Sequence, residues 1–239
     1  MELIICKSYE EMSSRAAALA AQVIVEKPDC LISFPGGNTP TVMLKAFVEL
    51  INSNQLDISK THFTMLDEWL GLSVDDTGSC ANFIWNHLLQ KLDKPFAGVH
   101  MIDGTGKPET QQAALDDYID KYGPLGVSVL GIGLNGHLGF NESGVSFDNN
   151  AHITPLSDIT KTIMHKYFPG NIHPEYGLTQ GIRQIMSAGR VILIANGSHK
   201  AEILQKAVCG KISSAVPASI LQQHPQCFIV TDQDAASLL

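Results

Sequence analysis

The sequence contains no apolar run of about 18 residues, the length that a membrane-spanning helix requires, so no transmembrane segment is expected. Its five cysteines are odd in number and scattered, and no CxxC pair occurs, so neither a zinc site nor a disulfide framework is indicated. Basic residues are scarce. The 16 Lys and Arg residues against 24 Asp and Glu residues give a net charge of −8, whereas nucleic-acid binders usually present a basic face. We therefore expect a cytoplasmic protein with free thiols and no membrane or nucleic-acid partner.

The composition that is present is that of an ordinary globular protein, with 44% apolar and 17% charged residues among 239. Short apolar runs alternate with segments of helical period. We predict strands over residues 3–6, 30–34, 61–66, 127–131, 190–195 and 227–231, and helices over 9–26, 39–52, 79–92, 110–122, 199–209 and 217–223. Strands separated by helices predict parallel βαβ units, and their continuous apolar character predicts a sheet buried on both faces. We expect one doubly wound, mostly parallel α/β domain over residues 1–239, with three Rossmann-like layers.

The most informative segment is residues 131–144, GIGLNGHLGFNESG, which follows a predicted strand. It holds four glycines before Glu142, with His137 among them. Open α/β sheets bind their ligands where strands end in loops of this kind. A His and a Glu on such a loop can exchange protons with a bound molecule. The same sequence is also compatible with a Gly-rich loop whose histidine is only a surface residue.

Three other predicted strand ends carry polar groups. Residues 35–40, PGGNTP, open a predicted helix, and paired glycines with helix-start N–H groups can bind phosphate, although many such turns are only turns. Asp67 and Glu68 point to opposite sides of an extended backbone, so one is expected to face a cleft and the other solvent. Lys200, near a helix start, has the charge to hold an anion, although most lysines are surface residues. No strand end carries a GxSxG serine. Because these ends meet at one edge of a parallel sheet, they predict proton-transfer chemistry on a small phosphorylated substrate.

These segments, in this order, resemble the glucosamine-6-phosphate deaminase/isomerase family and its galactosamine-6-phosphate branch. The likeness covers nearly the whole chain and includes residues 36–40, Leu66-Asp67-Glu68, residues 135–142, Leu178-Thr179-Gln180-Gly181, residues 197–201 and residues 216–219. The resemblance implies an enzyme of the hydrolase/isomerase class in amino sugar metabolism, which converts glucosamine 6-phosphate to fructose 6-phosphate and ammonia. It also implies that no metal or organic cofactor is needed.

The resemblance assigns roles to individual residues. His137 is expected to open the sugar ring, and Asn135 and Glu142 to orient and tune it. Asp67 is expected to move a proton from C2 to C1, which suits a carboxylate because it can serve adjacent carbons without leaving its place. The expected substrate- and phosphate-binding residues are Gly36, Gly37, Asn38, Thr39, Gly136, Lys166 and Lys200.

The sequence departs from the family pattern at several positions. Many members have Asp at the place of Asn135, and glucosamine-6-phosphate deaminases tend to have Arg at the place of Lys166, which keeps the charge but lacks the bidentate fork. Trp69 is closer to the galactosamine branch, and Ser143 replaces a usual Pro. The loop Gly-Gly-Asn-Thr-Pro is one residue longer than usual and resembles that of the 6-phosphogluconolactonases, which share the fold. These departures affect the identity of the sugar substrate more than the class of reaction.

Three functions therefore stand beside one another. The main expectation is deamination of glucosamine 6-phosphate, with galactosamine 6-phosphate giving tagatose 6-phosphate as the alternative. A 6-phosphogluconolactonase would hydrolyse an ester without a C2 base, so the presence of Asp67 together with the Asn141-Glu142 pair disfavours it. A non-enzymatic sugar-phosphate sensor would be free to lose Asp67 or His137, and both are present. Larger oligomeric members of the family have a C-terminal extension, whereas this sequence stops soon after its last predicted strand. The resemblance therefore implies a monomer or small homo-oligomer.

Overall fold

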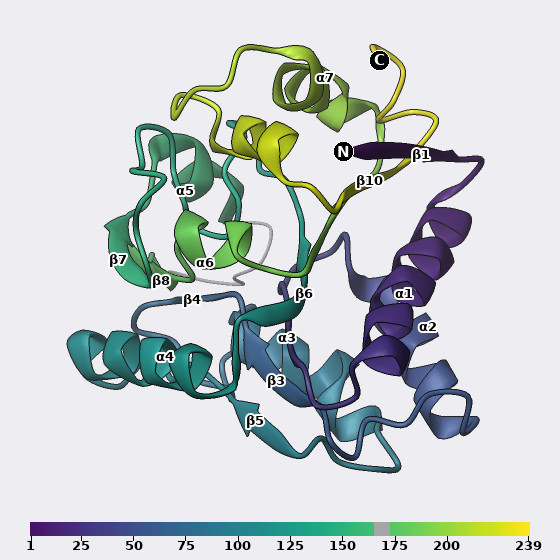
Figure 1. Ribbon diagram of the computed structural model, residues 1–239. Coiled ribbons are helices and arrows are strands. Elements are labelled where there is room, and N and C mark those ends of the chain that lie inside the picture. The colour runs from purple at the N-terminus through teal and green to yellow at the C-terminus, as the bar shows by residue number, and fades with distance from the viewer. Residues whose placement is uncertain (165–172) are drawn as a thin grey trace.

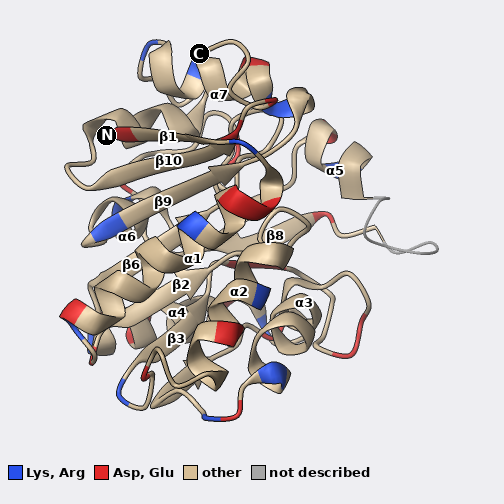
Figure 2. Ribbon diagram, turned by 90° about the vertical axis from the view of Figure 1, so that its right-hand side faces the viewer, with Lys and Arg blue, Asp and Glu red and all other residues tan. Residues whose placement is uncertain are grey.

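The computed structural model describes residues 1–164 and 173–239, and its main feature is a sheet of seven strands in the order β1-β10-β9-β6-β2-β3-β5. All neighbouring strands pair in parallel. The strands are β1 (Glu2–Cys6), β2 (Leu31–Phe34), β3 (His62–Met65), β5 (Gly98–His100), β6 (Leu125–Leu130), β9 (Arg190–Ala195) and β10 (Cys227–Asp232). Figure 2 shows them side by side, from β1 at the top to β3 at the bottom. The predicted doubly wound, mostly parallel sheet is confirmed.

Helices cover both faces of this sheet (Figure 1). On one face lie α1 (Tyr9–Glu26), α2 (Thr41–Asn52) and α3 (Cys80–His87), and on the other α4 (Pro108–Tyr122), α6 (Ile182–Met186) and α7 (Ala201–Cys209). Three 3₁₀ helices complete these layers: η1 (Leu89–Lys91), η2 (Ser198–Lys200) and η3 (Pro217–Gln223). Within the described residues, no helix combines the length and the apolar character that crossing a membrane requires.

The burial pattern explains why the central strands read as continuous apolar runs. Every residue of β2 is buried, as is β9 from Val191 onward. The helix α1 turns small residues such as Ala16 and Ala20 toward the sheet, which lets it pack closely. The edge strand β1 differs, because Leu3 and Ile5 remain exposed there. The apolar core therefore lies on both sides of the central strands, as in other sheets covered on two faces.

A second sheet, with three antiparallel strands, was not predicted from the sequence. Its order is β4 (Asp67–Trp69), β8 (Tyr176–Thr179) and β7 (His152–Pro155), and α5 (Asp158–Met164) follows β7. Each of these strands has only three or four residues, which is too short for hydrophobic periodicity to reveal. The chain leaves the large sheet after β3 and enters the small sheet at Asp67.

Gln180 joins the two sheets from a fully buried position. Its side-chain Nε2 donates to the Ser33 hydroxyl and to the Met65 carbonyl, both at 2.8 Å. Its backbone N–H donates to the Leu66 carbonyl at 2.9 Å. These bonds fix the point at which the chain passes from β3 to β4, and so they fix the start of the strand that carries Asp67.

The strand order creates a topological switch point between β2 and β6. From β2 the chain moves outward through β3 and β5, and from β6 it moves the opposite way through β9 and β10. The loops after β2 and β6 therefore diverge, and they leave a crevice at the carboxyl ends of these strands. Residues 35–40 and 131–144 are those two loops.

We expect Gln180→Met to lower the free energy of unfolding by about 1–3 kcal/mol, because it removes the amide donor from the buried Met65 carbonyl. Urea unfolding measures this difference. Gln223→Met, at an exposed position of η3, is the matched control and should unfold at the wild-type midpoint. Equal midpoints for the two variants would contradict the role given to Gln180.

Candidate active site

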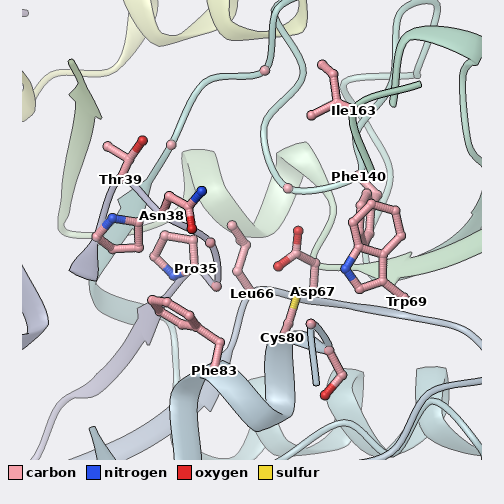
Figure 3. Close-up of a pocket in the computed structure, with 18 of the residues that line it drawn as sticks. Pro35, Asn38, Thr39, Leu66, Asp67, Trp69, Cys80, Phe83, Phe140 and Ile163 are labelled. Atoms are coloured by element: carbon pink, nitrogen blue, oxygen red, sulfur yellow. The ribbon is translucent and has the colours of Figure 1, made fainter. Parts of the chain in front are cut away.

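A cavity of about 400 Å³ lies at the switch point, within the size range of small-molecule sites. Its walls come from residues 35–40, the start of β4, α3, the loop after β6, α5 and Lys200. Figure 3 shows the carboxylate of Asp67 directed into the open space, between Leu66 and Trp69 and next to Cys80. The four strand ends singled out in the sequence therefore meet at one cavity.

Among the described residues that line this cavity, Asp67 is the one with a carboxyl group. Its side chain is 8% exposed, and burial raises the pKa of its carboxyl group to about 7. Burial also raises the pKa of the Cys80 thiol, so the thiol keeps its proton and donates it in a hydrogen bond to Asp67. A carboxylate that titrates near neutrality can accept a proton from a substrate and return it.

Glu68 does not face solvent, which corrects the expectation for this pair. Its carboxylate is fully buried and accepts hydrogen bonds from the backbone N–H groups of Trp69 at 2.8 Å, Cys80 at 2.9 Å and Ala81 at 2.6 Å. Two of these donors belong to the first turn of α3, whose N–H groups have no acceptor within the helix. Burial raises the pKa of Glu68 to about 8, and the three N–H donors act against that rise. Glu68 thus caps α3 inside the protein, because that helix start supplies the donors that water would otherwise provide.

His137 lies on the loop after β6 with its ring held between Glu142 and Gly133. Nδ1 of the imidazole is 3.3 Å from Oε2 of Glu142. A Cβ atom at Gly133 would lie 2.3 Å from Nε2 of His137, so only glycine leaves room for the ring. Because Nδ1 faces Glu142, Nε2 is the nitrogen that a molecule in the cavity can reach.

Four donors surround the carboxylate of Glu142, which lies behind His137 and is not among the cavity-lining residues. Oε2 accepts from Asn135 Nδ2 at 2.7 Å and faces His137. Oε1 accepts from the Thr160 hydroxyl at 2.6 Å and from the Ser157 N–H at 3.2 Å. Burial on its own would raise the pKa of Glu142, but the neighbouring His137, the Thr160 hydroxyl and the Asn135 amide lower it to about 2. The carboxylate is therefore ionised, so Nδ1 carries the proton in the bond between them.

The loop itself is shaped by glycines. Gly131, Gly133 and Gly136 have the GxGxxG spacing of dinucleotide-binding loops, but turns and not a helix follow them, so the structural context of that motif is missing. Gly136 has φ +83°, and a Cβ atom there would lie 2.7 Å from the Val216 side chain. Gly136 was expected to bind substrate, yet it is not among the residues that line the cavity, and it packs against Val216.

Four more of the residues expected to bind substrate form the loop after β2, at one end of the cavity. Gly36, Gly37, Asn38 and Thr39 all line it, and Figure 3 shows Asn38 and Thr39 at its rim. Lys200 lines it as well, and its Nζ donates to the Ile132 carbonyl at 2.6 Å. Lys166 lies outside the described residues.

Sequence reasoning missed the parts of the cavity that helices contribute. Phe83 on α3 and Ile163 on α5 line it, and Phe140 packs edge to face against Trp69 with ring centres 4.5 Å apart. The residues Cys80 and Phe83 lie one turn apart on a predicted helix, which was a usable signal for one shared face. Nothing in the sequence marked Ile163. In the part of the chain that the structure describes, no three His, Cys, Asp or Glu side chains gather as a metal site.

Comparison with known proteins shows the family to which this chain belongs. Residues 7–229 match the family model described as glucosamine-6-phosphate isomerases/6-phosphogluconolactonase. The chain belongs to this family. It is 33% identical to the glucosamine-6-phosphate deaminase of Thermoanaerobacter pseudethanolicus over 241 residues, which covers 100% of this chain and 95% of the relative. It is also 33% identical to that of Clostridium botulinum strain Loch Maree, with coverage of 100% and 99%.

Two solved structures match this chain to different degrees. A structure described as a monomeric glucosamine-6-phosphate deaminase matches with a TM-score of 0.95 at 34% identity, over 100% of both chains. The 6-phosphogluconolactonase of Thermotoga maritima matches with a TM-score of 0.77 at 18% identity, over 97% of this chain and 98% of that chain. The second likeness shows the shared fold alone.

We expect Asp67→Asn to stabilise the protein near pH 8 by up to roughly 4 kcal/mol and to have little effect near pH 4. The wild-type carboxyl group has a folded-state pKa of about 7, above its unfolded value of 3.8, so its contribution to stability falls as the pH rises between these values. Urea unfolding at both pH values measures the difference. Asp117→Asn, at an exposed position of α4, is the control and should follow the wild type at both. If both substitutions changed the free energy of unfolding equally at the two pH values, the cost assigned to the ionised Asp67 carboxylate would be contradicted.

Proposed function

We propose that this protein converts glucosamine 6-phosphate and water to fructose 6-phosphate and ammonia. The observation that carries the proposal is the placement of Asp67 and the His137–Glu142 pair at one cavity, beside a Gly-rich loop and Lys200. The reaction needs a base for the C2 proton, a proton carrier at the ring oxygen and a clamp for the phosphate. The full-length similarity to glucosamine-6-phosphate deaminases supports this choice among the family's activities.

In the ring-opening step, Nε2 of His137 takes the proton of the C1 hydroxyl and gives it to the ring oxygen. The bond between C1 and that oxygen breaks, and C1 becomes an aldehyde. The neutral imidazole with its proton on Nδ1 suits this transfer, because Nε2 then has a free lone pair. Glu142 and Asn135 hold the ring in that state from behind.

In the isomerisation step, the ionised Asp67 removes the C2 proton, and the C1 oxygen takes a proton from the C2 ammonium group. An enol with a C1–C2 double bond and an amino group on C2 forms. Asp67 then returns the proton to C1, which leaves an imine at C2. Water adds at C2 and ammonia leaves, so the product is the ketose. The pKa of about 7 makes Asp67 both a sufficient base and, once protonated, a sufficient acid for these two transfers.

The phosphate is proposed to bind at the loop after β2. The backbone N–H groups of residues 36–38, the Thr39 hydroxyl and Lys200 supply donors of the kind that phosphate oxygens accept. We further infer one domain over residues 1–239, since the solved deaminase aligns over the whole of both chains. A monomer or small homo-oligomer is inferred because that relative is described as monomeric. All five cysteines are free, which is in keeping with the cytoplasm.

Purified protein should release ammonia from glucosamine 6-phosphate, and Asp67→Asn should lower kcat by about 10²–10⁴-fold while the sugar phosphate still binds. Galactosamine 6-phosphate and 6-phosphogluconolactone complete the assay. Ammonia from galactosamine 6-phosphate alone would move the assignment to the epimer. Lactone hydrolysis with no ammonia from either sugar would overturn the deaminase assignment.

The value of kcat/KM should fall as the pH drops below about 7, because protonated Asp67 cannot accept the C2 proton. Steady-state rates measured between about pH 5 and pH 9 test this expectation. Asp117→Asn should keep the wild-type profile. A profile that stays flat down to about pH 5 would show that the base is a group with an ordinary carboxyl pKa.

A further inference from the structure

Thr160 connects the small helix α5 to the loop that carries His137. Its side chain lines the cavity, and the residue is 4% exposed. Its hydroxyl donates to Oε1 of Glu142 at 2.6 Å and lies 3.4 Å from Nδ1 of His137. The family resemblance assigns no role to this residue.

The side-chain hydrogen bonds around Thr160 form a series in which each donor points toward Glu142. Asn135 Nδ2 donates to the Ser157 hydroxyl at 3.2 Å, and that hydroxyl donates to the Thr160 hydroxyl oxygen at 3.1 Å. A hydroxyl has one proton to donate, and the ionised Oε1 of Glu142 is a closer acceptor than Nδ1 of His137. The Ser157 hydroxyl also accepts from the Thr160 backbone N–H at 3.3 Å. Each hydroxyl donates its single proton to the next side chain, and the series of side-chain bonds ends on the carboxylate.

The two oxygens of Glu142 are kept distinct by this arrangement. Thr160 and Ser157 occupy Oε1, so Oε2 is the oxygen left for Asn135 and for Nδ1 of His137. Without the Thr160 hydroxyl, Oε1 would keep only the longer bond from the Ser157 N–H. The carboxylate could then rotate, and the direction of the imidazole that depends on it would be lost.

We propose that Thr160 is a positioning residue for ring opening, whose hydroxyl holds the Glu142 carboxylate so that Nε2 of His137 points at the substrate. This inference rests on the proposed function, since ring opening is a step of that reaction. Thr160 itself need not touch the reacting atoms. Through this one hydroxyl, α5 becomes part of the proton-transfer machinery.

Three variants separate the hydroxyl from the shape of the side chain. Thr160→Val keeps the volume and removes the hydroxyl, whereas Thr160→Ser keeps the hydroxyl. Thr162→Val removes a hydroxyl from the same helix at an exposed position, where it donates to the Asp158 carbonyl at 2.8 Å and not to the site. His137→Gln is the reference for loss of the ring-opening group.

We expect Thr160→Val to lower kcat/KM for glucosamine 6-phosphate by about 10–100-fold, the range produced by loss of a hydrogen bond to a charged group. Thr160→Ser and Thr162→Val should stay within about threefold of the wild type, in line with surface changes of small effect. A glucosamine 6-phosphate analogue methylated on the C5 oxygen cannot close the six-membered ring. On that analogue, Thr160→Val should react at the wild-type rate.

Adding Thr160→Val to His137→Gln should cost almost nothing further, because a positioning residue acts only through the group it positions. If Thr160→Val lowered kcat/KM equally in the wild type and in His137→Gln, Thr160 would have a general structural role and the proposal would be overturned. The same conclusion would follow if Thr160→Val slowed the open-chain analogue as much as glucosamine 6-phosphate. Wild-type rates for Thr160→Val would overturn the proposal too.

A measurement without substrate separates this proposal from the proposed function. In the protein with ¹⁵N-labelled histidine, the Nδ1 proton of His137, assigned by its loss in His137→Gln, should give an exchange-protected NMR signal. Thr160→Val should shift or abolish that signal, and Thr160→Ser should retain it. If the wild type releases no ammonia from any amino sugar, the proposed deaminase function is wrong. The NMR signal still tests whether the Thr160 hydroxyl positions His137 through Glu142. An unchanged signal in a folded Thr160→Val protein would overturn the positioning role.

Discussion

The geometry of the cavity depends on one buried carboxylate, that of Glu68. Its donors come from β4 and from the first turn of α3, so it fastens the strand that carries Asp67 to the helix that carries Cys80. A carboxylate in such a place would be very costly without donors, and the helix start supplies them. Because successive side chains of a strand alternate, a Glu68 that points inward leaves Asp67 directed at the cavity. The hydrogen bonds of Glu68 therefore also determine the direction of the Asp67 side chain.

The carboxyl groups of Asp67, which lines the cavity, and Glu142, which lies behind His137, differ in acidity because their surroundings differ. Burial dominates at Asp67, whose pKa rises to about 7, since the weak thiol donor of Cys80 does little to offset it. At Glu142 burial alone would raise the pKa, but the neighbouring His137, the Thr160 hydroxyl and the Asn135 amide outweigh it and lower the pKa to about 2. One group can therefore exchange protons near neutrality while the other remains a fixed anion. Environments that separate titratable groups in this way are typical of sites with divided acid–base roles.

The sequence was sufficient to predict the large sheet, because its central strands are apolar runs. It was also sufficient to locate the loops of the site, because glycines follow the strand ends. It could not show the small sheet, whose strands are too short for a periodic signal. It also misplaced Glu68, because the donors of that carboxylate belong to a helix start that only the fold brings near. Thr160 escaped notice for the same reason, since its contact with Glu142 depends on the return of the chain through β7. The roles of Asp67 and His137 remain predictions.

The position of β1 has a consequence for the order of events during synthesis. The strand pairs in parallel with β10, with Glu2 opposite Phe228 and Cys6 opposite Asp232. The helix α1 packs across β10, β9 and β6, so its apolar face also waits for strands made much later. During synthesis, β2, β3 and β5 can associate early, whereas β1 must remain without its neighbour until β10 has emerged. Completion of the large sheet therefore waits for β10 and is governed by contacts between segments that are far apart in sequence.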